Sequence, residues 1–515
     1  MNHWIALPVI LPSLLAPLIV AAMRHDLSLQ RIFGAAGTLA LLGLAIGLFV
    51  ASGDGPQVYD MGNWPAPFGI VLVLDRLSAL MLLLTAVLSC AIFIYVVATD
   101  WDLKGRHFHA LFQFQLMGIN GAFLTGDLFN LFVFFEVLLI ASYGLMLHGG
   151  GAARLRAGLQ YVAINLAGAT LFLFALGTLY GLTGTLNMAE LAVRVPLLPE
   201  GDAALLRVGA VLLLMVFAVK AALVPLHFWL PIAYGAAPAP VAALFAIMTK
   251  VGAYAILRCY ILIFGEGSGA AEGLAGAWLM PAALVTVAVG MIGVLGARRL
   301  TPLVTFSVVG SMGTLLVAVA MFTEAATSVA LYYLLHSTFA AAALFLTAEL
   351  TATQRGAQSD ALRPSTPMAG NELLAGLFFA AAIAMVGMPP LSGFLGKLMV
   401  LDVVRGHALV WTIWAVVLVT SLIAVVGFAR AGSSLYWKSA QLGGGPAEDA
   451  PGPAPAAVAA AALLIAGPVA LTVFAGPAMA WLEAAAAELH APGIYIEAVM
   501  GAGAEAAAAD RLAAR

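Results

Sequence analysis

Long apolar stretches dominate this sequence, and each is close to the length that a helix needs to cross a lipid bilayer. A transmembrane helix takes about 20 mostly apolar residues. Membrane β-strands are about 10 residues long and alternate in polarity, which these stretches do not. We therefore predict an all-α polytopic membrane protein, with fourteen transmembrane helices at residues 4–23, 31–52, 75–98, 108–125, 128–148, 157–181, 205–225, 241–264, 273–296, 301–322, 326–350, 372–404, 409–432 and 456–482.

The composition supports a membrane protein and argues against several other classes. Apolar residues make up 63% of the 515 residues and charged residues 9%, which is too few to cover the surface of a soluble globule. The net charge of −3 and the lack of a basic run argue against a nucleic-acid partner. Cys90 and Cys259 lie in apolar stretches without a CxxC motif, so we expect no disulfide framework, no zinc or iron–sulfur site, and no cofactor.

The distribution of basic residues between the loops predicts the orientation, because cytoplasmic loops are enriched in Lys and Arg. The loops on one side, counted from the loop after the first stretch, contain Arg24, Arg31, Lys104, Arg106, Arg154, Arg156, Arg298, Arg299, Arg355, Arg363, Arg430 and Lys438. The other side contains the smaller set Arg76, Arg194, Arg207, Arg258, Arg405, Arg511 and Arg515. We expect the first side to be cytoplasmic, which places both termini outside.

Three lysines and two other ionisable residues lie inside the predicted helices. Lys220, Lys250 and Lys397 fall at membrane depth, where a lysine costs about 2.5–3.5 kcal/mol. Glu136 and His336 are the intramembrane carboxylate and imidazole. Such residues persist where they line a polar interior or a pathway. Three plainer interpretations stay open: Lys250 snorkels to an interface, Lys397 faces an aqueous crevice without a transport role, and His336 is a satisfied core histidine.

Proline breaks accompany two of these lysines. Pro225 follows Lys220 in the seventh stretch, and Pro389 and Pro390 precede Lys397 in the twelfth. Backbone groups freed in this way are tolerated in a membrane only where protein or water satisfies them. Interrupted helices at matching positions are typical of an internal repeat with an ion site near the midplane. We therefore predict two inverted five-helix repeats, helices 4–8 and 9–13, with helices 7 and 12 broken.

These features divide the chain into four expected segments. Residues 1–107 hold the first three helices, and residues 108–264 and 265–439 hold the two repeats. Residues 440–515 hold a linker rich in Gly and Pro, the last helix, and an Ala/Glu-rich tail from residue 483 that we expect to be helical or frayed at the surface.

Three long motifs carry a family resemblance. Residues 126–144 read GDLFNLFVFFEVLLIASYG, residues 227–258 begin HFWLP and continue through Lys250 to Arg258, and residues 387–397 read GMPPLSGFLGK. They resemble the antiporter-like membrane subunits shared by respiratory complex I and the Mrp-type multisubunit cation/proton antiporters. The sequence LPIAY at 230–234, where complex I subunits tend to read LPDAH, makes the chain look most like the D-type subunit of the Mrp, Pha or Mnh antiporters.

The resemblance implies a proton path along the bilayer midplane through Glu136, Lys220, Lys250, His336 and Lys397. Burial disfavours the charged form of such groups and a nearby opposite charge restores it, so forming or breaking a Glu136–Lys220 pair would move a proton. Some relatives have a lysine one turn after the histidine, where this chain has four alanines at 340–343. We therefore expect His336 to serve that stretch of the path together with water or with hydroxyls such as those of Ser337 and Thr338.

The implied function is that of a transporter subunit and not of an enzyme: a proton-translocating subunit of a Na⁺ (K⁺, Li⁺)/H⁺ antiporter in a prokaryotic cell membrane. Its expected partners are other membrane subunits and the lipid bilayer, and its substrates are protons and monovalent cations. The sequence assigns no metal site. Two alternatives remain, which are a proton-pumping subunit of a redox complex (NADH:quinone oxidoreductase or membrane-bound hydrogenase) and a scaffold with vestigial ionisable residues.

Overall fold

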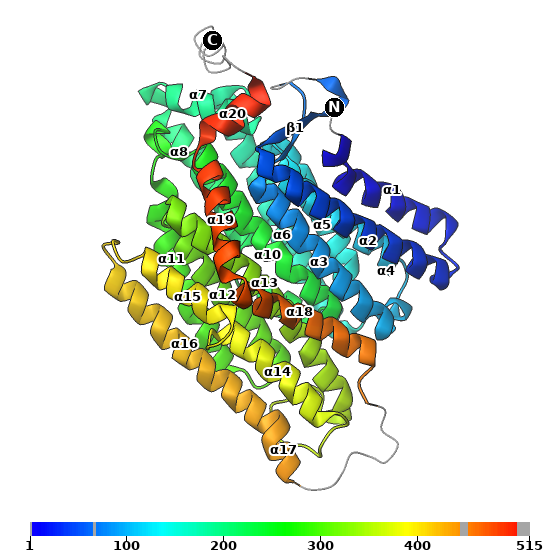
Figure 1. The fold of residues 1–515 in the computed structure, drawn as a ribbon. Helices are drawn as coiled ribbons and strands as arrows, with labels where there is room; N and C mark the ends of the chain where they lie inside the picture. The colour runs from blue at the N-terminus through cyan, green and yellow to red at the C-terminus, as the bar shows by residue number, and fades with distance from the viewer. Residues whose placement is uncertain (1–2, 65–67, 443–451, 502–515) are drawn as a thin grey trace.

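The computed structural model describes residues 3–64, 68–442 and 452–501, and it is a bundle of helices (Figure 1). The first half contains α1 (Leu7–Ala22), α2 (Leu27–Ala51), α3 (Arg76–Ala98), α4 (Phe108–Leu124), α5 (Leu128–Met146), α6 (Ala152–Thr183), α7 (Met188–Arg194), α8 (Ala203–Lys220), α9 (Trp229–Ala236) and α10 (Ala239–Leu262). The second half contains α11 (Leu274–Gly296), α12 (Leu300–Val319), α13 (Glu324–Gln354), α14 (Asn371–Val386), α15 (Ser392–Val403), α16 (Val410–Gly432), α17 (Lys438–Gln441), α18 (Pro455–Val473), α19 (Ala475–Leu489) and α20 (Pro492–Met500).

The helices confirm the predicted all-α membrane fold. Each of the fourteen apolar stretches corresponds to one of these helices or to a consecutive pair. Within the described ranges, 11 helical segments are long and apolar enough to cross a membrane, and α1 and α14 are shorter apolar helices. The first and last described elements, a short 3-10 turn at His3–Ile5 and α20, lie at the same end of the bundle (Figure 1).

A small β-hairpin between α2 and α3 was not predicted. Strand β1 (Gln57–Asp60) pairs antiparallel with β2 (Val71–Leu74), with Gln57 opposite Leu74. All four residues of β2 are buried, and its Leu72 also forms a bridge with Thr125 after α4. The hairpin therefore covers the end of the bundle at which α3 begins (Figure 1).

Both predicted helix breaks are confirmed. The seventh helix ends as α8 at Lys220 and resumes as α9 beyond its predicted end at residue 225, and the twelfth is divided into α14 and α15. Each broken helix follows one of the longest helices in the structure, α6 with 32 residues and α13 with 31 residues. This recurrence of a long helix before a broken one, five stretches apart, supports the internal repeat, whose inversion and boundaries stay predictions.

Helices α10 and α13 form the centre of the bundle (Figure 1). Every residue of α10 from Pro240 to Leu262 is buried, and α10 packs against α3, α8, α12 and α13. The elements that carry the ionisable residues adjoin in series: α5 packs on α6, α6 on α8, α8 on α10, α10 on α13, and α13 on α15. Residues far apart in the sequence are thereby carried by a series of neighbouring helices.

The C-terminal region packs against the helix bundle and does not lie apart from it at the surface. Helix α19 packs on α3 and α13, and its Leu482, Ala485 and Ala486 are buried. Helix α20 packs on α7. As far as residue 500 the tail is helical, as predicted, but its position at the surface is wrong, because one face of α19 and α20 is apolar and packs into the core. Most of the predicted linker (443–451) and residues 502–515 lie outside the described residues.

Candidate functional site

Lys220 lies at the C-terminal end of α8, where the helix is broken. Its side chain is 8% exposed, and its Nζ donates a hydrogen bond of 2.9 Å to Asn165 Oδ1 of α6. Within the described part of the chain, no ion pair joins Lys220 to Glu136, although the two are close enough to interact electrostatically. The Glu136–Lys220 pair is thus open in this structure, and Asn165, which the sequence analysis missed, is the direct partner of the lysine.

The break after Lys220 leaves backbone groups that side chains satisfy. Trp229 Nε1 donates 2.9 Å to the carbonyl of Val219, and Thr286 Oγ1 of α11 accepts 2.9 Å from the amide of Val224. Unpaired backbone groups within a membrane are costly, so such contacts are what permits an interrupted helix there. Side chains of α9 and α11 therefore satisfy the backbone groups that the break leaves unpaired.

Lys250 is the most isolated ionisable group of the set. It is 0% exposed in the middle of α10, and its Nζ has no hydrogen-bond partner among the described residues. The snorkelling interpretation is therefore wrong. Gly252 lets α10 approach the end of α8, because a Cβ there would lie 2.7 Å from the amide nitrogen of Ala221. This close contact brings the helix that carries Lys250 against the break that follows Lys220.

A small cavity lies beside Lys220, against the helix that carries Lys250. A cavity of about 10 Å³ is lined by Tyr161, Asn165, Lys220, Met248 and Val251, among others. About 10–15 Å³ is the least that holds one water molecule. This cavity therefore has room for about one water molecule beside Lys220.

His336 is buried in α13, and its hydrogen-bond partner is a serine that the sequence analysis did not name. Its Nδ1 lies 2.9 Å from Ser392 Oγ at the start of α15. The hydroxyls of Ser337 and Thr338 donate to the carbonyl of Leu334 on their own helix, and their part in the path beside His336 stays a prediction. His336 is also close enough to both Lys250 and Lys397 for electrostatic interaction.

Lys397 closes the second helix break. Its Nζ donates 2.7 Å to the carbonyl of Val386, the last residue of α14, and 2.8 Å to Ser421 Oγ of α16. A cation is favourable at the C-terminal end of a helix, where carbonyl groups are unpaired. The side chain is 7% exposed and fully engaged, which does not fit a lysine in an open aqueous crevice. Pro389 and Pro390 lie in the connection that Lys397 bridges.

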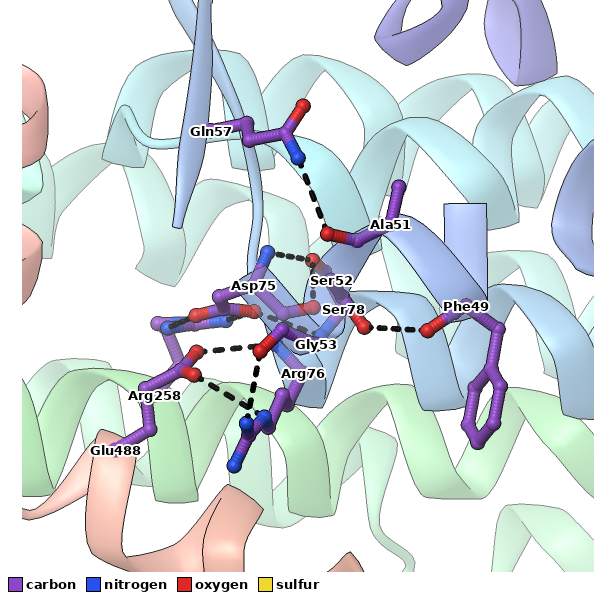
Figure 2. Close-up of polar contacts among 10 residues, drawn as sticks. All are labelled: Phe49, Ala51, Ser52, Gly53, Gln57, Asp75, Arg76, Ser78, Arg258 and Glu488. Carbon is purple, nitrogen blue, oxygen red and sulfur yellow. Dashed lines mark hydrogen bonds and ion pairs between the residues drawn. The ribbon is translucent and has the colours of Figure 1, made fainter. Parts of the chain in front are cut away.

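A buried ion pair anchors α10 at the end away from its N-terminus (Figure 2). Arg258, two turns after Lys250, donates 2.5 Å and 2.8 Å hydrogen bonds to the two carboxylate oxygens of Asp75 at the start of α3. Arg258 is 2% exposed and Asp75 4%. Counting Arg258 among the loop charges was therefore wrong: it lies inside α10, and the sequence analysis missed it because it stands close to the helix end.

The same cluster ties the C-terminal region to the bundle. Glu488 of α19 accepts 3.1 Å from the amide of Arg76 and lies 3.6 Å from its guanidinium (Figure 2). The ring of Tyr495 in α20 lies 5.3 Å from the Arg258 guanidinium. Asp75 and Glu488 do not form a metal site, since no group of three or more His, Cys, Asp or Glu residues in the described ranges has the geometry to hold a metal ion.

Replacing Asn165 with alanine is expected to impair transport. The change removes the acceptor of Lys220, and a hydrogen bond to a charged group contributes about 1.5–3 kcal/mol, which corresponds to a loss of about tenfold or more. The control is Thr170→Ala on the exposed face of the same helix, whose hydroxyl bonds its own backbone. Full cation/proton exchange by Asn165→Ala would show that Lys220 does not depend on this contact.

Replacing Gly393 with alanine is expected to destabilise the second break. A Cβ there would clash with the carbonyl oxygen of Ala384 and lie 2.9 Å from His336 Nε2. Overpacking of this kind costs about 1–3 kcal/mol. Gly376→Ala on α14 is the matched control, because its Cβ meets nothing within 4 Å. Thermal denaturation in detergent distinguishes the two variants, and equal stabilities would contradict the tight approach of α15 to α13.

Comparisons with known proteins agree with this architecture. Residues 125–424 match the family described as the transmembrane region of NADH:quinone oxidoreductase and Mrp antiporters. The matched region contains all five ionisable residues and both breaks. The chain belongs to this family. It is therefore a multi-pass bacterial membrane protein that acts in transport and not as an enzyme, as predicted.

Relatives within the family are subunits of antiporters. The chain is 39% identical to the D subunit of a probable K⁺/H⁺ antiporter from Rhizobium meliloti, over 98% of each chain. It is 38% identical to the D subunit of the Na⁺/H⁺ antiporter from Bacillus subtilis, over 85% of this chain and 87% of the relative. These likenesses confirm the predicted resemblance to the D-type subunits.

Solved structures show the same fold. A chain of the Mrp complex from Dietzia sp. DQ12-45-1b superposes with a TM-score of 0.86 at 28% identity, covering 97% of this chain and 100% of that one. A chain of the archaeal membrane-bound sulfane sulfur reductase also gives 0.86, at 25% identity, with coverage of 96% and 99%. A chain of respiratory complex I from Thermus thermophilus gives 0.78 at 24% identity, with coverage of 94% and 99%.

Proposed function

We propose that this chain is the proton-translocating membrane subunit of a multisubunit Na⁺ (K⁺, Li⁺)/H⁺ antiporter, and that protons pass through Glu136, Lys220, Lys250, His336 and Lys397. The observation that carries the proposal is the fully buried, unpartnered amine of Lys250 in the middle of a helix that is buried throughout the described structure. An isolated charge there is costly, so its presence is explained by what it does and not by stability.

The packing order of the helices supports the order of the path. Lys220 is on α8, Lys250 on α10, His336 on α13 and Lys397 on α15, and each of these helices packs against the next. Each group loses hydration in the bundle, which disfavours its charged form, and a neighbouring charge restores it. A proton arriving at one group therefore alters the protonation of the next. One charge crossing 100 mV exchanges about 2.3 kcal/mol, which is enough to drive cation movement.

Glu136 indicates where another subunit binds. Phe129, Val133 and Ile140 lie on the same face of α5 as Glu136, with exposures of 48%, 37% and 65%, and Glu136 itself is only partly buried. A carboxylate at this depth does not face lipid. We infer that a membrane subunit of the assembly covers this face of α5, while the termini lie outside the cell, as the basic residues predict.

A second function is supported by one observation. The superposition on a chain of the membrane-bound sulfane sulfur reductase is as close as that on the Mrp complex. A subunit of a redox-driven proton pump would use the same buried residues, with electron transfer in other subunits as the driving force. Salt sensitivity of a deletion strain distinguishes the two, since loss of an antiporter sensitises cells to Na⁺ or K⁺ and loss of a redox pump lowers electron transfer.

The test is transport by the complete complex in everted vesicles. Lys220→Arg keeps the positive charge but cannot release a proton, so it and Glu136→Ala are expected to abolish ΔpH-driven Na⁺ or K⁺ exchange. The exposed Lys438→Arg is the matched control and should exchange normally. Intact exchange by both Lys220→Arg and Glu136→Ala, with the complex assembled, would rule the proposed pair out of the path.

A further inference from the structure

A large cavity lies at the loop end of the bundle, away from α20. It has a volume of about 530 Å³ and is enclosed by the start of α6, the α9–α10 junction, the start of α12 and the end of α13. Its polar lining includes Trp101, Arg154, Tyr234, Glu349 and Asp360. The loops at this end carry the larger set of basic residues, so the sequence predicts that the cavity faces the cytoplasm.

Glu349 is the one carboxylate of this lining that has no basic partner among the described residues. Its Oε1 accepts 2.7 Å from Trp101 Nε1 and its Oε2 accepts 3.0 Å from the Tyr95 hydroxyl, and both donors are neutral. Asp360 is in contrast fixed by an ion pair of 2.5 Å with Arg299 and by the amide of Thr301 at 3.1 Å. Glu349 is therefore the carboxyl group of the cavity best able to exchange a proton.

Lys104 and Arg154 are close enough to Glu349 to act on it electrostatically, but neither forms an ion pair with it in the described structure. The amine of Lys104 lies 3.5 Å from the centre of the Trp101 ring. The Arg154 guanidinium is directed to backbone carbonyls, with hydrogen bonds of 2.9 Å to Ala236 and 2.7 Å to His148. Its charge stabilises a carboxylate at a distance without holding it in an ion pair. The carboxylate of Glu349 can consequently take up and lose a proton without breaking a salt bridge.

The cavity reaches toward the buried path. Ala242 and Tyr234 line its inner part, and the Tyr234 hydroxyl donates 2.8 Å to the carbonyl of Phe245 on α10. Ala242 is eight residues before Lys250, which is about 12 Å along a helix. Glu349 is thirteen residues after His336 on α13, or about 20 Å. The cavity therefore shortens the distance that a proton crosses between the loop face and Lys250 to about two helical turns.

We propose that this cavity is the aqueous opening of the proton path on the loop face, and that Glu349 is its terminal proton-carrying group. A proton arriving from the path converts the Glu349 carboxylate to the acid. The acid then gives that proton to a water molecule of the cavity, which becomes hydronium, and the carboxylate is restored. This inference rests on the proposed function, and it assigns to Glu349 a role that a purely structural tie between α13 and α3 would not have.

Cysteine accessibility tests the opening independently of transport. In the complete complex with Cys90→Ser and Cys259→Ser, we expect Ala348→Cys, which lines the cavity, to react with a membrane-impermeant charged thiol reagent in everted vesicles. Ala341→Cys is the matched control, since Ala341 is seven residues earlier on the same helix and about as buried as Ala348 (1% against 3% exposed), but it does not line the cavity. No reaction of Ala348→Cys, or reaction only in right-side-out vesicles, overturns the proposal.

Transport by Glu349 variants tests the proton-carrying role. Glu349→Gln keeps the acceptor for Trp101 and Tyr95 but carries no proton, and we expect exchange to fall about a hundredfold, the order that a positioned proton-transfer group contributes. Glu349→Asp should restore part of it, and Tyr95→Phe, which keeps the carboxylate, should retain most of it. Equal losses in Glu349→Gln and Tyr95→Phe would indicate a structural tie and overturn the proposal.

The Glu349 variants and the Lys220 variant distinguish a wrong opening from a wrong path. If Lys220→Arg abolishes exchange while Glu349→Gln retains it, the opening is elsewhere and the buried path stands. If both variants retain exchange, the path itself is wrong.

Discussion

Replacing Asp75 with asparagine should destabilise the protein by about 3–5 kcal/mol, the cost of leaving one member of a buried ion pair without its partner. Arg258 would remain charged at 2% exposure in a helix that is buried along its length. Asp75 is also the N-cap of α3, where it accepts 2.8 Å from the Ser78 amide. Asparagine serves equally well as an N-cap, so the substitution removes the charge and leaves the cap.

The measurement is thermal denaturation of the purified complex in detergent. Adding Arg258→Met to the Asp75→Asn variant should recover much of the loss, because the unpaired charge is then gone. Glu488→Gln, at the edge of the same cluster, should have a smaller effect, since its contacts with Arg76 are longer. A single Asp75→Asn variant as stable as the unmodified protein would show that the pair does not hold α10 against α3.

Replacing Lys250 with methionine should have the opposite effect on stability. The side chains are similar in size, and the change removes a buried amine that has no hydrogen-bond partner in the described part of the chain. Replacing buried charges with apolar groups is often stabilising by about 1–4 kcal/mol. We expect Lys250→Met to raise the denaturation temperature and to abolish transport, whereas Lys438→Met on the surface should change neither.

The two outcomes together separate function from folding. Replacing a residue that is kept for stability lowers both stability and transport. Replacing a residue that is kept for function lowers transport alone. If Lys250→Met lowered the stability of the complex and the loss of transport followed from misassembly, Lys250 would be a structural residue. Replacing Arg258, which is paired with Asp75, should in contrast lower the stability of the complex.

The features that the sequence predicted well are those imposed by the lipid bilayer. A bilayer demands about 20 apolar residues per crossing, so the helices could be placed from the apolar stretches alone. The breaks at Pro225 and Pro389–Pro390 followed from the missing amide of proline and the charge of a nearby lysine. Lys250 was predicted at membrane depth because it lies inside an apolar stretch, and its complete burial excludes an interfacial position.

The features that sequence did not predict depend on which helices meet. Asn165 became the partner of Lys220 because α6 packs on α8, although a lone asparagine inside an apolar stretch was a signal that could have been used. Ser392 gave no such signal, because serine is common at helix starts. Arg258 and Glu349 stand near helix ends, where a charged residue usually faces water, so only the packing of α3 and α13 reveals them as internal.

The most direct test of the buried path is proton movement through proteoliposomes containing the purified complex with Lys250→Met. Cation-dependent dissipation of an imposed ΔpH, followed with an internal pH-sensitive dye, should fall to the rate of protein-free liposomes, while the subunits remain assembled and the denaturation temperature does not fall. Dissipation at the rate of the unmodified complex would contradict the proposed path, because protons would then cross this subunit without the buried amine on which the path depends.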